Sequence, residues 1–195
     1  MISLQDAIDS LYEIAVTEDK PTSTKRLEVL AAMCIEQLGL RGIADAMAEL
    51  AVPGIGRSKK WDVGWPATGK VRLGISLKSL LSNISGTVPN RVDDLAGEVA
   101  NVQLLSPEIV TGYLVVFHVG NGMRQDGTRW VDFFREAIER LSGRDAPAWA
   151  TGMVEASALV EVDFSNGPVV VDAPDMDGFF DRLAICVQDR NPDMF

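Results

Sequence analysis

Histidine and cysteine are scarce in this chain of 195 residues, which has one histidine and two cysteines. A zinc site needs a cluster of Cys and His ligands, so the composition argues against one. The single histidine, His118, ends an apolar run typical of a buried strand, and no Gly-x-Ser-x-Gly motif is present to support a Ser-His-Asp hydrolase. Cys34 and Cys186 fall in helix-like apolar patterns. We interpret them as reduced core residues of a cytoplasmic protein rather than as a disulfide.

Long apolar runs and a basic leader are also missing. No stretch reaches the roughly 18 uninterrupted apolar residues of a transmembrane helix, and the first twenty residues carry acids where a signal peptide would be basic. The segment "PGIGRSKK" contains Gly, Lys and Ser but lacks the Gly-x₄-Gly-Lys-Ser/Thr spacing of a phosphate-binding loop. Apolar residues make up 47% and charged residues 24%, which is ordinary for a globular protein. We expect a single domain spanning 1–195, without membrane association.

Basic residues are few overall but are concentrated in one segment. The net charge is −10, yet residues 53–91 contain seven basic residues and one acid, a local charge of +6 that leaves −16 for the remainder. An acidic body with one basic block can bind a polyanion locally, while the bulk charge discourages nonspecific binding. The alternative is that the block is a solvated loop and strand face. The basic residues are Arg57, Lys59, Lys60, Lys70, Arg72, Lys78 and Arg91.

The apolar periodicities predict a mixed α/β fold with about five strands and helices on both faces of the sheet. Three helices are expected in the first 52 residues, the last of them over 41–52. Residues 70–78 alternate with period 2, which predicts a strand with one buried face and with Ser76 and Lys78 on its polar face. "WDVGW" (61–65) forms a hairpin with it. A helix over 91–105, a buried strand over 109–119, a helix, a second hairpin over 157–174 and a closing helix follow.

The spacing of Asp62, Ser76 and Lys78 carries the candidate chemistry. Hydrolysis of a phosphodiester uses a divalent ion held by hard oxygen ligands, together with a cation near the developing charge. A carboxylate on one strand, followed on the next strand by a second carboxylate and a Lys two residues apart, supplies these groups, and Ser76 stands at the position of the second carboxylate. The ordinary alternatives are that Asp62 is a turn or cap residue and that Ser76 and Lys78 lie on an exposed strand surface.

This pattern resembles the PD-(D/E)xK nucleases, and in particular the type II restriction endonucleases. Their core begins with a helix, continues as a three-stranded antiparallel meander, and adds a helix and another strand. The predicted order is similar from about residue 24 to residue 118, so the resemblance implies a nuclease-like core there and family-specific decoration over 119–195. It also implies Mg²⁺ as the cofactor, double-stranded DNA as the partner and a homodimer, because palindromic sites require two-fold symmetry.

Two positions depart from the family pattern. Trp61 stands where a Pro usually precedes the first acid, and Ser76 replaces the second acid. Some relatives carry Ser or Thr at this position and take the carboxylate from the following helix. Here Arg91, Asp94 and Glu98 are spaced i, i+3 and i+7, so they share one helix face. Glu98 is the first candidate for the migrated ligand and Asp94 the second, while a solvated helix face is the alternative.

The resemblance implies a role for each residue. Asp62 and Glu98, or Asp94, would hold the metal with the backbone carbonyl of Leu77, Ser76 would bind a metal water, and Lys78 would orient the attacking water or offset phosphate charge. DNA phosphates would be contacted by basic side chains, because a duplex needs distributed cationic contacts. These are Arg57, Lys59, Lys60, Arg72 and Arg91.

Three hypotheses for the function follow. The first is a Mg²⁺-dependent endonuclease that cuts double-stranded DNA, acting as a cytoplasmic restriction or defence enzyme. The second, motivated by Ser76, is a catalytically inactive DNA-binding or assembly subunit with a nuclease fold. The third is an acidic interaction protein such as an inhibitor module, which the net charge of −10 permits.

Overall fold

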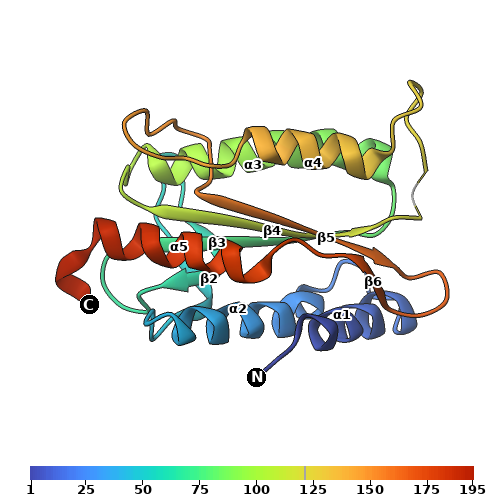
Figure 1. Ribbon diagram of the computed structural model, residues 1–195, viewed down its shortest axis with the longest axis horizontal. Helices are drawn as coiled ribbons and strands as arrows, with labels where there is room; N and C mark the ends of the chain where they lie inside the picture. Colours follow the sequence, from blue (N-terminus) through green and yellow to red (C-terminus); the bar gives the residue numbers. More distant parts are fainter. Residues whose placement is uncertain (121) are drawn as a thin grey trace.

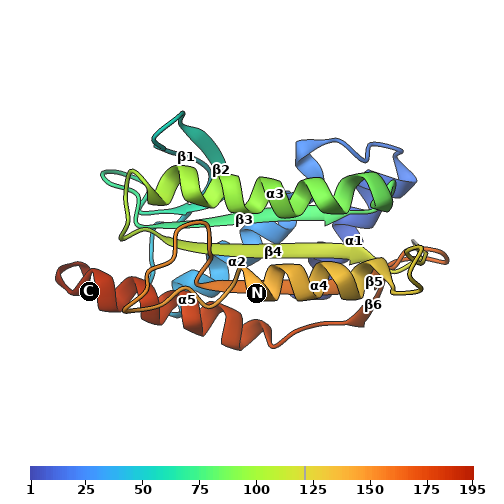
Figure 2. The same ribbon diagram turned by 90° about the horizontal axis from the view of Figure 1, so that it is seen from above.

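The chain folds around a six-stranded mixed sheet, shown from two directions by a computed structural model that describes residues 1–120 and 122–195 (Figures 1 and 2). The strands lie in the sheet in the order in which they occur in the chain. The second strand is antiparallel to the first and to the third, the third, fourth and fifth run parallel to one another, and the sixth is antiparallel to the fifth. They are β1 (Met47–Val52), β2 (Lys59–Trp65), β3 (Leu73–Leu80), β4 (Val110–His118), β5 (Ala156–Asp163) and β6 (Val169–Asp172).

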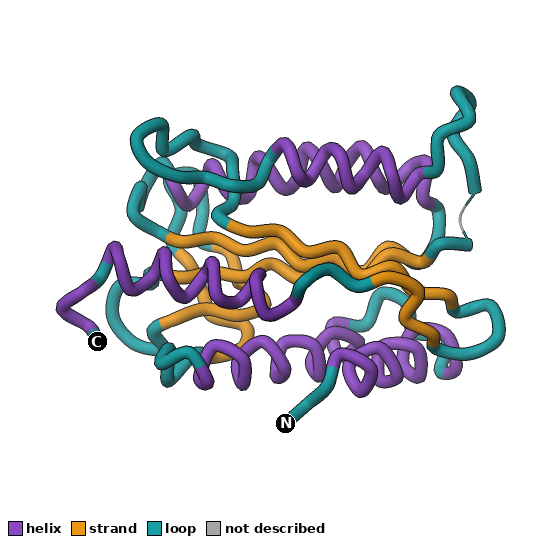
Figure 3. The backbone as a smooth tube through the Cα atoms, in the orientation of Figure 1, coloured by secondary structure: helices purple, strands orange, loops and turns teal. Residues whose placement is uncertain are grey.

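Helices cover both faces of this sheet (Figures 1 and 3). One face carries α3 (Ile84–Gln103) and α4 (Trp130–Arg140), and the other carries α1 (Leu4–Tyr12), α2 (Glu28–Leu40) and α5 (Met176–Arg190). Short helical turns are η1 (Glu13–Thr17), η2 (Thr24–Leu27) and η3 (Pro192–Met194). The prediction of a mixed α/β fold with helices on both faces is confirmed.

Local sequence signals account for several of the helix ends. Ser3 and Asp6 form a capping box at the start of α1, in which each side chain accepts a hydrogen bond from the other's backbone N–H. Asp175 caps α5 by accepting from the N–H of Gly178 at 2.9 Å. The capped termini satisfy backbone donors that would otherwise lack partners.

Two apolar cores lie on opposite sides of the sheet, because the central strands are buried on both faces. The core under α1, α2 and α5 includes Val63, Ile75 and Leu114, and the core under α3 and α4 includes Trp61 and Val115. The prediction that residues 70–78 leave one polar face exposed is therefore wrong. α3 packs over that face, and Ser76 is only 5% exposed.

The segment 41–52, predicted to be a helix, instead contributes strand β1. Its Ala- and Met-rich sequence has good helix propensity, but β1 pairs with β2 along Met47 to Val52. Asp45 and Glu49 have positive φ values of 62° and 55°, which a helix does not contain. Tertiary pairing therefore overrides the local propensity here.

The remaining predicted elements are present, although the helix predicted over 91–105 begins seven residues earlier, at Ile84, in a stretch expected to be a loop. The hairpins of β2 with β3 and of β5 with β6 form where the alternating patterns predict them, and the long apolar run is the central strand β4. The sheet has six strands rather than about five because β1 was not predicted. Cys34 and Cys186 are both buried and free. Among the described residues, no helix has the length and apolar character that crossing a bilayer requires.

From α2 to β4 the order of elements is a helix, three antiparallel strands, a helix, and a strand parallel to the third. This arrangement places the first half of β2, the C-terminal end of β3 and the middle of α3 beside one another. Residues in those three places form the candidate site.

Candidate functional site

Strands β2 and β3 separate at Asp62. Their backbone pairing covers Trp65 to Val63 on β2 and ends at the pair Val63 and Ile75. Beyond that pair, the Oδ2 of Asp62 accepts a hydrogen bond from the N–H of Leu77 at 2.7 Å. A side chain has thus replaced the backbone partner that a continued ladder would supply, and the half-buried carboxylate is fixed beside the end of β3.

A cavity of about 370 Å³ opens at this separation and is called the β2–β3 pocket below. Five of its lining side chains are cationic and four are acidic, so the lining has a net positive charge. It combines residues from η2, β1, the segment before β2, β2, β3 and α3. The lining residues are Thr24, Arg26, Leu27, Glu49, Arg57, Lys59, Asp62, Leu77, Lys78, Arg91, Asp94 and Glu98.

Eight residues that the sequence singled out therefore line one cavity. Three of them, Asp62, Lys78 and Glu98, come from β2, β3 and α3 respectively. The other five are Arg57, Lys59, Leu77, Arg91 and Asp94. The spatial convergence is what the resemblance implies, whereas the chemical role of each residue stays a prediction.

Helix α3 presents its charged face to the pocket because its apolar stripe is fixed against the sheet. Leu95, Val99 and Val102 are buried in the core under α3 and α4. Glu98 forms an ion pair with Lys59, which ties α3 to β2, and its side chain is only 15% exposed. Asp94 pairs with Arg91 three residues earlier, at 2.8 Å. Both candidate migrated carboxylates are thus engaged by cations.

Two charged residues of the pocket were not predicted from the sequence, Arg26 and Glu49. Arg26 reaches in from η2, donating from Nε to the Oγ of Ser79 at 2.9 Å and from Nη1 to the carbonyl of Ser23 at 2.5 Å. Burial lowers the pKa of Arg26, although the nearby Asp62 carboxylate opposes the shift. Glu49 lies on β1, next to β2. No sequence signal indicated it, because the segment around it resembles a helix.

Three other predicted residues lie outside the lining of the β2–β3 pocket. Ser76 is buried within the sheet, opposite Tyr113 in the parallel register of β3 and β4. The Nζ of Lys60 lies 3.8 Å from Glu49 on an exposed surface. Arg72 precedes β3 and contacts Glu108 at 3.3 Å. Ser76 lies on the same side of β3 as Lys78, as predicted, but the prediction that this side is exposed at Ser76 is wrong, because α3 packs over it.

Two buried polar atoms near the pocket have no hydrogen-bond partner among the described residues: the Tyr113 hydroxyl and the Nε of Arg91. Burial raises the pKa of Tyr113, and the nearby Arg91 opposes this, whereas Glu98, Asp94 and Asp62 reinforce it. The phenol is therefore a neutral donor at physiological pH. Unsatisfied buried donors are uncommon, and those found at a functional site often receive a water or ligand.

The donor types needed for a magnesium ion are present, although they do not form a closed cluster. Among the described residues, no three Asp, Glu, His or Cys side chains are grouped so that they could hold a metal ion. Mg²⁺ commonly takes only one or two carboxylates, with waters completing its shell. Asp62, Glu98 and the carbonyl of Leu77 fit that smaller demand. Because Lys59 already binds Glu98, a metal that used Glu98 would have to displace this ammonium group.

No family model, curated protein or solved structure matches the chain. The β2–β3 pocket combines an acid on β2 whose carboxylate is fixed to the backbone of β3, a lysine on β3, an acid-bearing helix and a surplus of cations. Such a lining suits a polyanionic ligand that presents phosphate oxygens.

Proposed function

We propose that the protein is a Mg²⁺-dependent endonuclease that hydrolyses phosphodiester bonds of double-stranded DNA. The observation that carries the proposal is the convergence of Asp62, Lys78 and Glu98, from three separate elements, on the β2–β3 pocket. Acidic ligands beside a strand-end lysine and a cationic rim are the groups that phosphodiester hydrolysis needs. A restriction or defence role, a cytoplasmic location and a homodimer that binds a palindromic site are parts of the same proposal.

In this proposal the acidic residues would bind the metal ion and the lysine would interact with the phosphate. Asp62 and Glu98, with the Leu77 carbonyl, would hold the ion, which when bound supplies a polarised phosphate and an activated water. Lys78 would stabilise the negative charge that develops on the phosphate oxygens. Asp62 keeps its orientation because one carboxylate oxygen is held by the N–H of Leu77. The other oxygen of Asp62 receives no hydrogen bond from the described residues and is available as a ligand.

The cations of the pocket would bind the DNA backbone. Arg57 has no ion-pair partner among the described residues, and the ammonium of Lys59 is shared only with Glu98. An approaching phosphate would compete with Glu98 for Lys59, and this competition would release the carboxylate to the metal. Substrate binding and assembly of the metal site would thus be coupled through one lysine.

The test is cleavage of supercoiled plasmid with Mg²⁺ by the protein and its variants. Asp62→Asn keeps an oxygen acceptor for the Leu77 N–H but removes the charge, and Lys78→Ala removes the ammonium group. Each is expected to lower the cleavage rate by about 100-fold or more, the size typical of losing a principal electrostatic group. Lys70→Ala is the matched control, because Lys70 belongs to the basic segment but lies outside the β2–β3 pocket.

Cleavage by Asp62→Asn and Lys78→Ala at the rate of the unmodified protein would refute the assigned site. Circular dichroism of each variant establishes that a loss of cleavage is not a loss of folding. Chelation with EDTA should abolish cleavage, and restoring Mg²⁺ should recover it.

The second candidate function is a DNA-binding or assembly subunit that has lost the chemistry. Two observations favour it: a buried Ser76 stands at the position of the second acid, and Glu98 and Asp94 are both neutralised by basic neighbours. It predicts retardation of duplex DNA at low salt with no cleavage in Mg²⁺ or Mn²⁺. It also predicts that Glu98→Ala leaves DNA affinity undiminished, because removal of Glu98 frees Lys59.

A further inference from the structure

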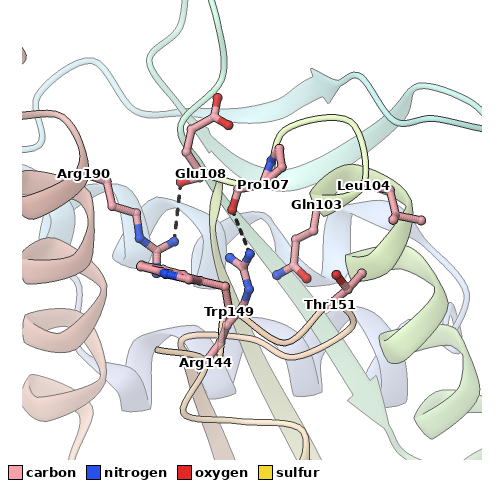
Figure 4. Close-up of a pocket in the computed structure, with 8 residues that line it drawn as sticks. All are labelled: Gln103, Leu104, Pro107, Glu108, Arg144, Trp149, Thr151 and Arg190. Atoms are coloured by element: carbon pink, nitrogen blue, oxygen red, sulfur yellow. Dashed lines mark hydrogen bonds between the residues drawn. The ribbon is translucent and has the colours of Figure 1, made fainter. Parts of the chain in front are cut away.

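A second cavity, of about 500 Å³, lies where α3 and α5 end and β4 begins (Figure 4). It shares no lining residue with the β2–β3 pocket. Its lining includes Leu104, Pro107, Arg144, Trp149 and Arg190. It is called the arginine pocket below, and none of its residues has a part in the proposed nuclease chemistry.

Two guanidinium groups in this pocket share a single buried carboxylate. The Oε1 of Glu155 accepts from Arg144 at 2.9 Å and from Arg190 at 2.7 Å. The Oε2 of Glu155 accepts from the backbone N–H of Thr111 at 2.6 Å. Because Arg144 and Glu155 are almost fully buried and Arg190 is 10% exposed, the cluster has an excess positive charge in a poorly solvated place. Such a charge favours an anionic partner.

The two arginines differ in how many donors they have left. Arg144 also donates to the carbonyls of Ala150, Ile109 and Pro107, at 3.1, 3.3 and 2.8 Å. Arg190 uses only its Nη1, and no described residue accepts a hydrogen bond from its Nε or Nη2. Those two nitrogens are not sealed in the core, because unpartnered fully buried atoms in the described chain are confined to Trp61, Arg91 and Tyr113. Arg190 therefore retains a donor pair suited to two oxygens of one anion.

An aromatic ring lies over both guanidinium groups. The Trp149 ring centre is 4.2 Å from the guanidinium carbon of Arg190 and 5.4 Å from that of Arg144. Figure 4 shows the indole beside these two side chains, with Leu104 and Thr151 across the cavity. Trp149 is 39% exposed and Leu104 is 57% exposed, so both offer apolar surface to a ligand. Trp149 also has a positive φ of 45°, a strained conformation that recurs at ligand sites.

The one acid that lines the arginine pocket does not cancel its charge. Glu108 forms ion pairs with Lys70 and with Arg72. Although partial burial opposes its ionisation, the hydrogen bond from Lys70 lowers the pKa of Glu108, so the carboxylate is fully charged and already paired. In Figure 4 its carboxylate points away from the guanidinium groups of Arg144 and Arg190.

We propose that the arginine pocket binds a small organic anion with a planar ring, the anion held by Nε and Nη2 of Arg190 and the ring lying between Trp149 and Leu104. The cavity has the size of typical small-molecule sites. Both a carboxylate and a phosphate monoester present two negatively charged oxygens that can accept hydrogen bonds from one guanidinium group. The proposal is independent of the nuclease assignment, because the two pockets share no residues.

Isothermal titration calorimetry on the full chain tests the proposal with two matched pairs of probes, 2-naphthoate against 2-naphthol and AMP against adenosine. Within each pair the ring is the same and only one member is anionic at pH 7. At least one anion is expected to bind about tenfold or more tightly than its neutral partner, and more tightly than inorganic phosphate alone. Tighter binding of AMP identifies a phosphate site, and tighter binding of naphthoate identifies a carboxylate site.

Two variants and one control localise the binding. Arg190→Gln removes the donor pair, and Leu104→Glu places a negative charge at the pocket wall on an exposed position that does not threaten folding. Each substitution should lower the affinity for the anionic probe by about tenfold or more. Leu105→Glu is the control, because Leu105 is similarly exposed but does not line the pocket. Equal affinity for charged and neutral probes, absence of binding by both anions, or unchanged binding in Leu104→Glu overturns the proposal.

Discussion

At the scale of single residues, removal of the Glu155 side chain would leave two buried guanidinium groups without their ion-pair partner. Its two carboxylate oxygens serve Arg144, Arg190 and the backbone of Thr111. An ion pair of this kind contributes little net stability compared with apolar residues, but removal of one member strands the other. The contribution of Glu155 to the free energy of unfolding is therefore best measured by removing its charge.

Glu155→Gln is expected to lower the free energy of unfolding by about 3–5 kcal/mol, because two guanidinium groups lose their counter-charge in the interior. Urea denaturation at pH 7 measures the change. The matched control is Glu136→Gln, which breaks an exposed i, i+4 pair with Arg140 and should cost no more than about 0.5 kcal/mol. A cost for Glu155→Gln below about 1 kcal/mol would show that water compensates the buried charges.

The residues of the β2–β3 pocket differ in how far the sequence revealed them. Asp62 and Lys78 were predictable because they lie on two strands joined by a short connection, which brings the two residues close together in space. Glu98 was predictable because helix periodicity puts it on the face of Asp94 and Arg91. Arg26 and Glu49 were not, since their approach depends on how η2 and β1 pack against β2. Ser76 was misplaced because a polar residue in an alternating strand does not reveal that a helix covers it.

At the scale of elements, alternation and periodicity predicted the hairpins and all five α-helices, but they could not separate a helix from a strand over 41–52. The residues of that segment favour a helix by intrinsic propensity, but the segment pairs with β2 and therefore forms a strand. Its partner, β2, is held close to β1 and β3 by glycines at which a side chain would collide. A Cβ on Gly64 would lie 2.6 Å from Leu50, and one on Gly74 would lie 2.6 Å from the ring of Trp61.

Two glycine-to-alanine substitutions should therefore have opposite effects. Gly74→Ala is expected to destabilise the protein by about 1–3 kcal/mol, because the buried Trp61 ring must move. Gly97→Ala, in the middle of α3 with no atom within 4 Å of the added carbon, should stabilise it by about 0.5–1 kcal/mol through helix propensity. Thermal and urea unfolding of the two variants measures both signs. Stabilisation by Gly74→Ala would mean that β2 and β3 are not packed as closely as described.

At the scale of the whole molecule, the basic segment of the sequence is divided between two places. Arg57, Lys59, Lys78 and Arg91 gather around the β2–β3 pocket, whereas Lys70 and Arg72 pair with Glu108 beside the arginine pocket. The segment's charge of +6 is thus not one continuous surface. Only the first group is placed to contact a duplex at the proposed nuclease site.

The salt dependence of DNA binding should reflect this division. If the β2–β3 pocket binds duplex DNA, Arg57→Gln should reduce the slope of log affinity against log salt concentration by about 0.9, the value for one lost phosphate contact. Lys70→Gln should leave the slope unchanged. Fluorescence anisotropy with a short labelled duplex in EDTA, over a series of NaCl concentrations, gives the slopes. An equal effect of the two substitutions would indicate diffuse attraction instead of a defined binding face.

The agreement between strand order and chain order has a consequence for how the molecule is assembled during synthesis. Each strand joins the sheet beside the strand made just before it, so none has to be inserted between two others. The buried residues of the core under α3 and α4 fall between Val52 and Leu159, and we expect this core to be able to form while later segments are still being made. The opposite core contains residues from Ala7 to Val187, so it cannot be complete before α5 is made. Arg41, at the end of α2, forms ion pairs with Asp177 and Asp181 of α5. We therefore expect the packing of α1 and α2 with α5 to be completed last, against a sheet whose opposite face is already covered by α3 and α4.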